Sequence, residues 1–396
     1  MAGGAAHRRG PARHGGAAAR RDRGGLRGAG PRSPPEGGDR PGRGRSARGR
    51  TPVALTLPAL TRAAVYHPDG EIRLETRPLR PPGPGEVLVR LRACGLCSGE
   101  TMAWYMARKA PVPLGHEPVG EVAATGPGVE LPEGTRVFVH HHAPCGACRA
   151  CRRGDAVHCP TWRRTRLEPG GLADYTLVPP EIVAADLLPL PEEVGDERGV
   201  FVEPLACAVK SLRRAGLRAG DRVAVVGLGV MGLLHVLAAR ALGAAVVAGV
   251  DVRPDRLEMG RALGAVVGEM TCAGGAEGGT QALLDGGADV VVVTPPSPEA
   301  IATGLACTAP AGRLVLFAPL PPGATFPLPV HDLFFREVSL IPSYSAGPAE
   351  TREALRLLAA GLPVERLVTH RLPLERAAEG YRLVASGDAL KVVVKP

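Results

Sequence analysis

The sequence predicts an α/β protein of two domains, in which a β-rich domain is followed by a doubly wound parallel sheet. At 396 residues the chain is longer than one ordinary hydrophobic core supports, so two domains are expected. Residues 63–184 have the pattern of short strands separated by turns that contain Pro and Gly. From about residue 209, apolar strands alternate with helical segments, which is typical of a parallel sheet covered by helices.

The first 60 residues differ from the rest of the chain. Residues 1–50 contain 13 arginines against three acidic residues, so they contribute +10 to a net charge of +9 and the remainder carries −1. Few large apolar side chains are present there to offset the entropy of ordering. We therefore predict that residues 1–60 form a disordered, basic, low-complexity tail that precedes the native start of translation. An RNA-binding arm and a transit peptide are the alternatives.

The composition of the remaining chain excludes several classes of protein. No apolar run is long enough to span a bilayer, and the N-terminus lacks the apolar segment of a secretory signal, so we predict a cytoplasmic protein without a membrane partner. Because the chain beyond the tail is almost neutral and only 3% of the residues are aromatic, we expect no nucleic-acid partner.

Hydrophobic patterning places the individual elements. Residues 86–92 alternate with period two, so one face of this strand is buried, and residues 119–126 and 136–140 have the same pattern. In the second half, strands are predicted at 222–226, 245–250, 288–293 and 313–318, and helices follow the first two of them. Beyond residue 342 we expect helices at 349–360 and 374–385 and strands at 367–371 and 391–394.

A glycine-rich turn predicts a dinucleotide site. Gly227, Gly229 and Gly232 form the pattern G-x-G-x-x-G between a predicted strand and a predicted helix, which is the context that this motif requires. Its glycines permit a tight turn, a close approach of the backbone to a pyrophosphate, and packing of the helix on the strand. Asp251 ends the next strand, where a carboxylate accepts hydrogen bonds from ribose hydroxyls, so NAD is predicted rather than NADP. Arg253 is nearby, and an arginine there could instead accommodate a 2′-phosphate.

Four cysteines are spaced as metal ligands within fifteen residues. Without secretion, clustered cysteines indicate metal binding rather than disulfides. Four thiolates satisfy a closed tetrahedral zinc site, which is structural and not catalytic, and an iron–sulfur cluster is the alternative. A run of three histidines at 140–142 precedes this loop. These histidines could bind metal, but we expect them to form a solvated strand edge. The four predicted ligands are Cys145, Cys148, Cys151 and Cys159.

A second set of ligand-type residues lies between Cys97 and Glu117. The thiol of Cys97, the imidazole of His116 and the carboxylates of Glu100 and Glu117 are the donor types that bind zinc. Glu203 follows in a Glu-Pro-Leu sequence between the two domains. It would complete a set of Cys97, His116 and Glu203 that leaves a fourth position open for chemistry.

Two further cysteines need an interpretation. Cys94 is expected to pack in the core, because free cysteines are often fully buried. Cys207 is expected to pack as well, and it is the reserve third ligand if Glu203 is not one.

Together these motifs resemble the zinc-containing medium-chain dehydrogenase family, which includes alcohol, polyol and threonine dehydrogenases. The resemblance covers residues 62–396. It implies a GroES-like catalytic domain formed by residues 62–206 and 345–396, with a structural zinc lobe at 140–160. It also implies a Rossmann dinucleotide-binding domain at 207–344 and assembly as a homodimer or homotetramer.

The resemblance assigns roles to individual residues. A catalytic zinc would be bound by Cys97, His116 and Glu203, the last directly or through water, and Glu117 would contact the metal or exchange onto it. The four cysteines of the lobe would bind a structural zinc, which gives two zinc ions per chain. Lys391, in the last strand, would reach the pyrophosphate of the coenzyme.

The residues after Cys97 depart from the family pattern. Family members usually continue with a hydroxyl residue and aspartate, whereas this chain reads Cys97-Ser-Gly-Glu. Glu100 is then expected to orient His116, and Ser98 is the candidate for relaying the proton. Met102 stands where some members carry a relay histidine, so the route of the alcohol proton stays open.

We therefore predict a zinc-dependent oxidoreductase that transfers hydride between NAD and a small-molecule alcohol or polyol, including an amino alcohol such as threonine. A simple alcohol or aldehyde dehydrogenase is the alternative enzyme. A non-catalytic binder of NAD or of nucleic acid is the alternative from another class, and the complete set of metal ligands argues against it.

Overall fold

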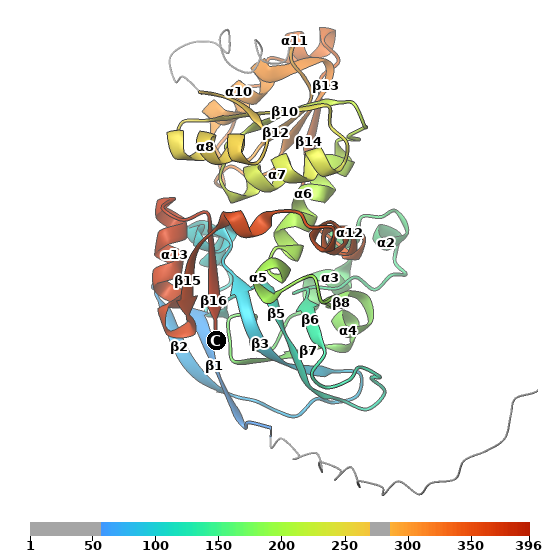
Figure 1. Cartoon of the computed structure of the whole chain (residues 1–396), viewed down its shortest axis with the longest axis vertical. Helices are drawn as coiled ribbons and strands as arrows, with labels where there is room; N and C mark the ends of the chain where they lie inside the picture. The colour runs from blue at the N-terminus through green and yellow to red at the C-terminus, as the bar shows by residue number, and fades with distance from the viewer. Residues whose placement is uncertain (1–56, 270–285) are drawn as a thin grey trace, which may run out of the picture. The chain divides into compact units, whose positions relative to one another are not determined.

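The computed structural model describes residues 57–269 and 286–396 (Figure 1). Residues 1–56, which include nearly all of the predicted tail, lie outside the described residues. Within the described ranges, no helix combines the length and the apolar character needed to cross a bilayer.

The nucleotide-binding half contains six parallel strands in the order β11-β10-β9-β12-β13-β14, which is the doubly wound order with the first strand at the centre. Both faces of this sheet are covered, so its strands consist largely of apolar, β-branched residues, as in Arg222–Val226. The strands are β9 (Arg222–Val226), β10 (Val246–Asp251), β11 (Val266–Glu269), β12 (Ala288–Val293), β13 (Thr308–Leu316) and β14 (Ser339–Pro342).

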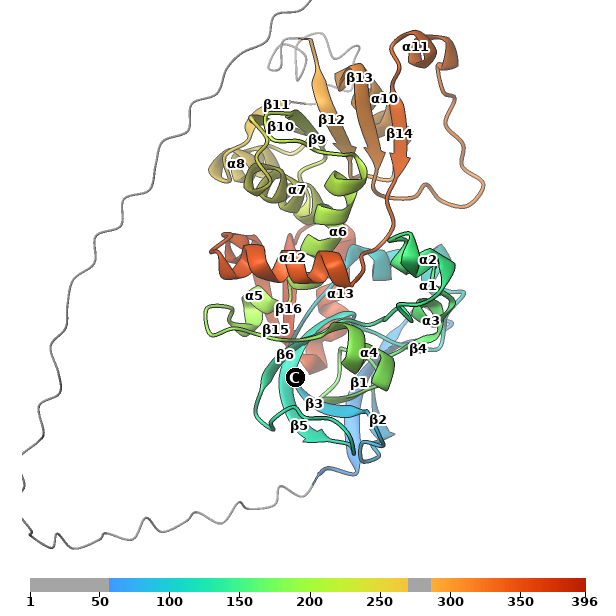
Figure 2. The same ribbon diagram turned by 90° about the vertical axis from the view of Figure 1, so that its right-hand side faces the viewer.

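Helices cover both faces of this sheet (Figure 2). Val223 and Val225 of β9 face one core, which they share with α6 (Val202–Arg214) and α7 (Val230–Ala241). Ala224 and Val226 point to the opposite face, into a core that contains α10 (Pro298–Cys307). The remaining helices of this half are α8 (Pro254–Ala262) and α11 (Val330–Phe335).

The β-rich half is built around a seven-stranded sheet with the order β15-β16-β3-β5-β6-β8, and β7 pairs with β3. Of the two C-terminal strands, drawn in red in Figure 1, β16 pairs with β3 from the early part of the chain, and β15 pairs with β16. The chain therefore leaves this sheet to form the nucleotide-binding half and returns to complete it. The strands are β3 (Val87–Gly95), β5 (Glu117–Thr125), β6 (Arg136–Val139), β7 (Tyr175–Val178), β8 (Leu187–Pro189), β15 (Val368–Pro373) and β16 (Lys391–Lys395).

A smaller sheet and several short helices surround the seven-stranded sheet. The small sheet has the order β2-β1-β4, formed by β1 (Leu60–Tyr66), β2 (Ile72–Pro78) and β4 (Val112–Pro113). Helix α12 (Pro348–Ala359) packs on α6, and α13 (Ala377–Ser386) packs on η1 (Ser98–Thr101) and β16. The other helices are α1 (Ala103–Met106), α2 (Arg149–Arg152), η2 (Ala156–His158), α3 (Pro160–Arg164), α4 (Pro180–Asp186), α5 (Asp196–Gly199), η3 (Val364–Leu367) and η4 (Leu374–Arg376).

The turn between β9 and α7 depends on two of its glycines for its shape. Gly227 has a φ of +86°, which side chains rarely allow. A Cβ atom on Gly232 would lie 1.8 Å from the carbonyl oxygen of Gly227, whereas a Cβ atom on Gly229 would meet nothing within 4 Å. Gly232 is therefore required by packing, and Gly229 leaves open space in front of the helix N-terminus.

We expect Gly232→Ala to destabilise the protein much more than Gly229→Ala. Gly232→Ala should lower the free energy of unfolding by about 3 kcal/mol, because the backbone must shift to admit the methyl group. Gly229→Ala should change it by less than about 0.5 kcal/mol, because a poorer N-cap is offset by a less flexible unfolded chain. Urea unfolding of both variants measures the difference, and equal losses would contradict the assignment.

Candidate active site

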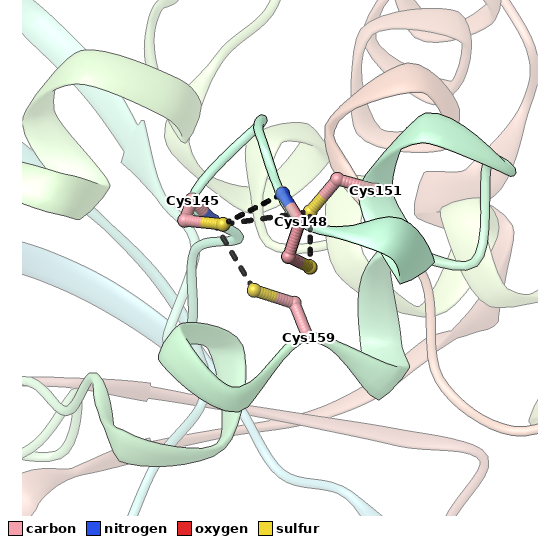
Figure 3. Close-up of side chains that lie close together, drawn as sticks. All are labelled: Cys145, Cys148, Cys151 and Cys159. Atoms are coloured by element: carbon pink, nitrogen blue, oxygen red, sulfur yellow. Dashed lines mark hydrogen bonds between the residues drawn. The ribbon is translucent and has the colours of Figure 1, made fainter.

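Four cysteine sulfurs converge in the lobe that follows β6. Cys145, Cys148, Cys151 and Cys159 place their sulfur atoms within 4.8 Å of one another, and Figure 3 shows the side chains pointing inward. The Sγ–Sγ distances are 3.5 Å from Cys148 to Cys151 and 4.0 Å from Cys145 to Cys151. A zinc–sulfur bond of about 2.3 Å in a tetrahedron gives sulfurs about 3.8 Å apart, so the four thiols fit that metal.

Backbone N–H groups stabilise negative charge in this lobe. The N–H of Cys145 donates to the sulfur of Cys159 (3.3 Å), and that of Cys148 donates to the sulfur of Cys145 (3.4 Å). Burial acts to raise the pKa of Cys159, but N–H donors from Cys145 and Trp162 outweigh it and lower the pKa to about 6. The lobe thus favours a thiolate before any metal is bound.

A first mixed cluster lies at the ends of two paired strands. Cys97 lies two residues after the end of β3. His116 directly precedes β5, and Glu117, the first residue of β5, pairs with Gly95 of β3. The ligand atoms of Cys97, His116 and Glu117 lie within 4.8 Å of one another. Thiolate, imidazole and carboxylate form a donor set that suits zinc.

Glu100 holds the imidazole of this cluster. Its Oε1 lies 3.0 Å from Nδ1 of His116 and accepts the N–H of Gly115 (3.1 Å). The hydroxyl of Tyr381, on α13, donates to the other carboxylate oxygen. Burial acts to lower the pKa of His116, but Glu100 and Cys97 outweigh it and raise the pKa well above its usual value. An Nδ1–H group held by a carboxylate leaves Nε2 of His116 free to bind a metal.

A second cluster adjoins the first. His140, His141 and Glu203 also place ligand atoms within 4.8 Å of one another, and the rings of His116 and His141 are 5.0 Å apart. Glu203 therefore groups with two histidines, and Glu117 completes the group of Cys97 and His116. Cys207, the reserve ligand, is buried and donates its S–H to Oε1 of Glu203 at 3.4 Å.

The carboxylate at the end of β10 organises the glycine-rich turn. Oδ2 of Asp251 accepts the N–H of Leu228 (2.6 Å), and Oδ1 accepts the N–H of Arg253 (2.9 Å). The guanidinium of Arg253 bonds to the carboxylate of Asp255 at 2.9 and 3.0 Å and to the carbonyl of Gly387 at 2.8 Å. Arg253 is thus already engaged by protein groups.

Known families match both halves of the chain. Residues 83–192 match the alcohol dehydrogenase GroES-like domain, and residues 230–360 match the zinc-binding dehydrogenase domain. The sorbitol dehydrogenase of Gallus gallus is 32% identical over 351 residues, which cover 84% of this chain and 96% of the relative. The chain belongs to the zinc-containing medium-chain dehydrogenase/reductase family. The predicted family, fold class and enzyme class are therefore confirmed, and the chain is a zinc-dependent oxidoreductase of alcohols and polyols.

Solved structures of this family have the same fold. An alcohol dehydrogenase from Thermus sp. ATN1 is 31% identical with a TM-score of 0.74, and the match covers 84% of this chain and 99% of that one. A zinc-binding dehydrogenase from Sinorhizobium meliloti 1021, solved with NADP bound, is 28% identical with a TM-score of 0.76, over 86% of this chain and 100% of that one. Zinc and a nicotinamide coenzyme follow from membership of the family.

The structure of this dehydrogenase corrects the prediction for Lys391. Its side chain is 1% exposed, and Nζ lies 2.5 Å from Oε2 of Glu117 and 3.2 Å from the carbonyl of Leu96. Gly95 leaves room for this pair, because a Cβ atom there would lie 2.0 Å from Oε2 of Glu117. Burial opposes the charge of Lys391, but Glu117 more than compensates and the pKa is raised. Lys391 therefore neutralises Glu117 and does not point to a coenzyme phosphate.

The histidine run was also predicted wrongly. His140 is fully buried. His141 is half-buried, and its Nδ1 atom is not accessible to solvent. The signal was available in the sequence, since the run directly continues the apolar strand Arg136–Val139 into the interior. Tyr381 was missed as well, and no local pattern indicates it, because it meets Glu100 from 281 residues further along the chain.

Two predicted residues have little contact with the clusters. Ser98 is exposed on η1, and within residues 57–269 and 286–396 its hydroxyl makes no hydrogen bond. Its proposed part in a proton relay therefore has no support from the geometry. Cys94 is fully buried in an apolar cluster with Leu96 and Met106, in the packing position that was expected.

Replacing Lys391 should leave the buried carboxylate of Glu117 unpaired and destabilise the protein. We expect Lys391→Met to lower the free energy of unfolding by about 3–5 kcal/mol, because an unpaired carboxylate remains in the interior. The control is Lys395→Met on the same strand, whose half-exposed pair with Glu197 at 2.8 Å contributes less than about 1 kcal/mol. Urea unfolding measures both. Unchanged stability with coenzyme binding weakened tenfold would instead restore the pyrophosphate role of Lys391.

Proposed function

We propose that this dehydrogenase oxidises a polyol, or a closely related alcohol, by transferring hydride to NAD at the cluster of Cys97, His116 and Glu117. The observation that carries the proposal is this donor set, which is held in a ligand-ready arrangement from several elements. The buried Oε1 of Glu117 has no hydrogen-bond partner among the described residues, as expected for an atom that faces a ligand.

The residues of this site would have distinct roles in the reaction. Zinc held by Cys97, His116 and Glu117 would supply Lewis-acid activation of the substrate hydroxyl. Glu100 keeps His116 in one tautomer and one orientation, and Tyr381 fixes Glu100. The four cysteines of the lobe would hold a second, structural zinc, which leaves no open position for chemistry.

Polyols are favoured as substrates because sorbitol dehydrogenases recur among the relatives of this chain, from Gallus gallus to Bacillus subtilis. An amino alcohol such as threonine stays within the proposed class. A simple alcohol is the second candidate, and the likeness to the Thermus alcohol dehydrogenase supports it.

NAD is the proposed coenzyme. The carboxylate of Asp251 lies at the end of β10, where it would meet the adenine ribose and repel a 2′-phosphate. Arg253 is paired with Asp255, so it offers no free guanidinium to such a phosphate. NADP remains the alternative because the Sinorhizobium meliloti structure contains it.

We also propose that the chain is divided into domains at residues 62–206 with 345–396, and 207–344, and that it forms a homodimer or homotetramer. The second copy would cover α11 and the edge strand β14. Val330, Phe334 and Phe335 on α11 are 68–74% exposed, which is unusual for large apolar side chains. Among the described strands, β14 pairs only with β13, so its other edge is open to a partner.

A substrate screen with a ligand variant tests the proposed activity. The full-length protein should reduce NAD faster than NADP with one or more polyols, followed by the absorbance of the reduced coenzyme. Cys97→Ala should lower kcat about 10³-fold, because several kcal/mol of transition-state stabilisation are lost. Cys94→Ala is the matched control and should retain activity. Near wild-type turnover of a folded Cys97→Ala protein would reject the proposal.

Charged residues on α11 should prevent assembly. We expect the double variant Phe334→Glu, Phe335→Glu to elute as a monomer near 41.0 kDa, whereas the wild type has a multiple of that mass. Light scattering coupled to gel filtration measures the mass. Leu74→Glu, at a 40% exposed apolar position on β2, is the control and should leave the oligomer intact. A monomeric wild type would contradict the proposed assembly.

A further inference from the structure

The outer part of the cysteine lobe is strongly basic. Residues 149–166 contain six arginines and one aspartate, so their net charge is +5, and four thiolates around a zinc ion would add −2 and leave +3. All six arginines are exposed. Arg153 pairs with Asp155 at 3.3 Å, and among the described residues no other arginine of this segment forms an ion pair. The segment therefore attracts anions from outside the chain.

A cavity lies beside this basic segment. Its volume is about 450 Å³, which is within the range of sites that hold small molecules. It is formed by the end of α3, the residues that follow and the start of α4, and these two helices are neighbours in both views (Figure 1 and Figure 2). The polar residues that line it are Thr161, Arg164, Thr165, Arg166, Glu168 and Glu181.

Two guanidinium groups line the cavity, and neutral protein groups hold both of them. Nη2 of Arg164 donates to the hydroxyl of Thr161 at 3.4 Å, and Nη1 of Arg166 donates to the carbonyl of Thr165 at 2.7 Å. Thr165 is fixed in turn, because its buried hydroxyl accepts the N–H of Ala143 at 2.9 Å. Each guanidinium thus keeps its charge and further N–H groups for an oxyanion, which arginine binds through paired hydrogen bonds.

Two carboxylates line the same cavity and restrict the ligands that fit it. Glu168 lies 3.3 Å from the guanidinium of Arg80, which partly offsets its charge. Glu181 is exposed and forms no ion pair among the described residues. A bare polyanion would be repelled by Glu181, whereas a ligand with a hydroxyl or amino group can donate a hydrogen bond to it. The cavity therefore favours an oxyanion that also carries such donors.

We propose that this cavity binds a small metabolite whose phosphate or carboxylate group contacts Arg164 and Arg166 and whose hydroxyl or amino groups contact Glu181. The site is separate from both metal clusters, because none of their ligands lines it. It does not depend on the proposed dehydrogenase activity, and its ligand need not be the substrate.

Titration calorimetry of the full-length protein with inorganic phosphate tests the oxyanion end of the site. The ionic strength is held constant, and saturating NADH occupies the glycine-rich turn, where phosphate could also bind. Phosphate should bind the wild type saturably. Arg164→Met and Arg166→Met should each weaken this binding about tenfold, because each removes charged hydrogen-bond donors. Absence of saturable binding in the wild type would overturn the proposal.

Arg163→Met is the matched control. Arg163 is the neighbour of Arg164 on α3, it is equally charged and exposed, and it does not line the cavity. Its replacement should change the affinity for phosphate less than about twofold, because only the surrounding field is reduced. Equal losses in Arg163→Met and Arg164→Met would show a diffuse basic surface and reject a built site.

Glu181→Ala tests the other end of the cavity and leaves both arginines in place. It should strengthen the binding of inorganic phosphate, since a repulsive charge is removed, and weaken the binding of glycerol 3-phosphate, whose hydroxyl groups lose an acceptor. A change of the same sign for both probes would contradict the role of Glu181. Glycerol 3-phosphate and glycerate distinguish a phosphate ester from a carboxylate as the ligand, and binding of neither would reject the site.

Discussion

The ion pair of Glu117 and Lys391 is the interaction on which the rest of the site depends. It joins the first residue of β5 to the first residue of β16, which is the last strand of the chain. Each charge is buried, so each destabilises the protein unless the other is in place. A buried pair adds little net stability compared with apolar residues, but it tolerates one arrangement only. The C-terminal strand must therefore dock in register before the first cluster can form without an unpaired charge.

In both clusters, the candidate metal ligands and most of the groups that support them come from different parts of the chain. Residues that could bind metals come from the chain before the nucleotide-binding half, between Cys97 and Glu203. The groups that hold them come largely from the chain after it. Tyr381 on α13 fixes Glu100, Lys391 on β16 neutralises Glu117, and Thr351 on α12 bonds to Asp186. The return of the chain to the first sheet is thus what sets the geometry of the site.

The sequence predicted what is local and missed what depends on register. Ligand spacing in the lobe and the glycine turn could be recognised because each occupies a short stretch with one required backbone shape. The direction of Lys391 could not be predicted, since adjacent residues of a strand point to opposite faces and the pairing of β16 with β3 decides which face is buried. The burial of His140 also follows from the pairing of β6 with β8, but here the apolar strand Arg136–Val139 before it was a signal in the sequence.

Because of these features, metal binding is coupled to the folding of the β-rich half. The nucleotide-binding half is stabilised by apolar packing on both faces of its sheet, and its buried His235 is satisfied by Ser211 at 2.6 Å and by the carbonyl of Met231 at 2.7 Å. The β-rich half instead encloses several carboxylates, of which Lys391 pairs with Glu117. Because ions bound there compensate charges that the unfolded chain would expose to water, part of the metal affinity becomes stability of the fold. The two halves should therefore differ in how much of their stability comes from bound metal.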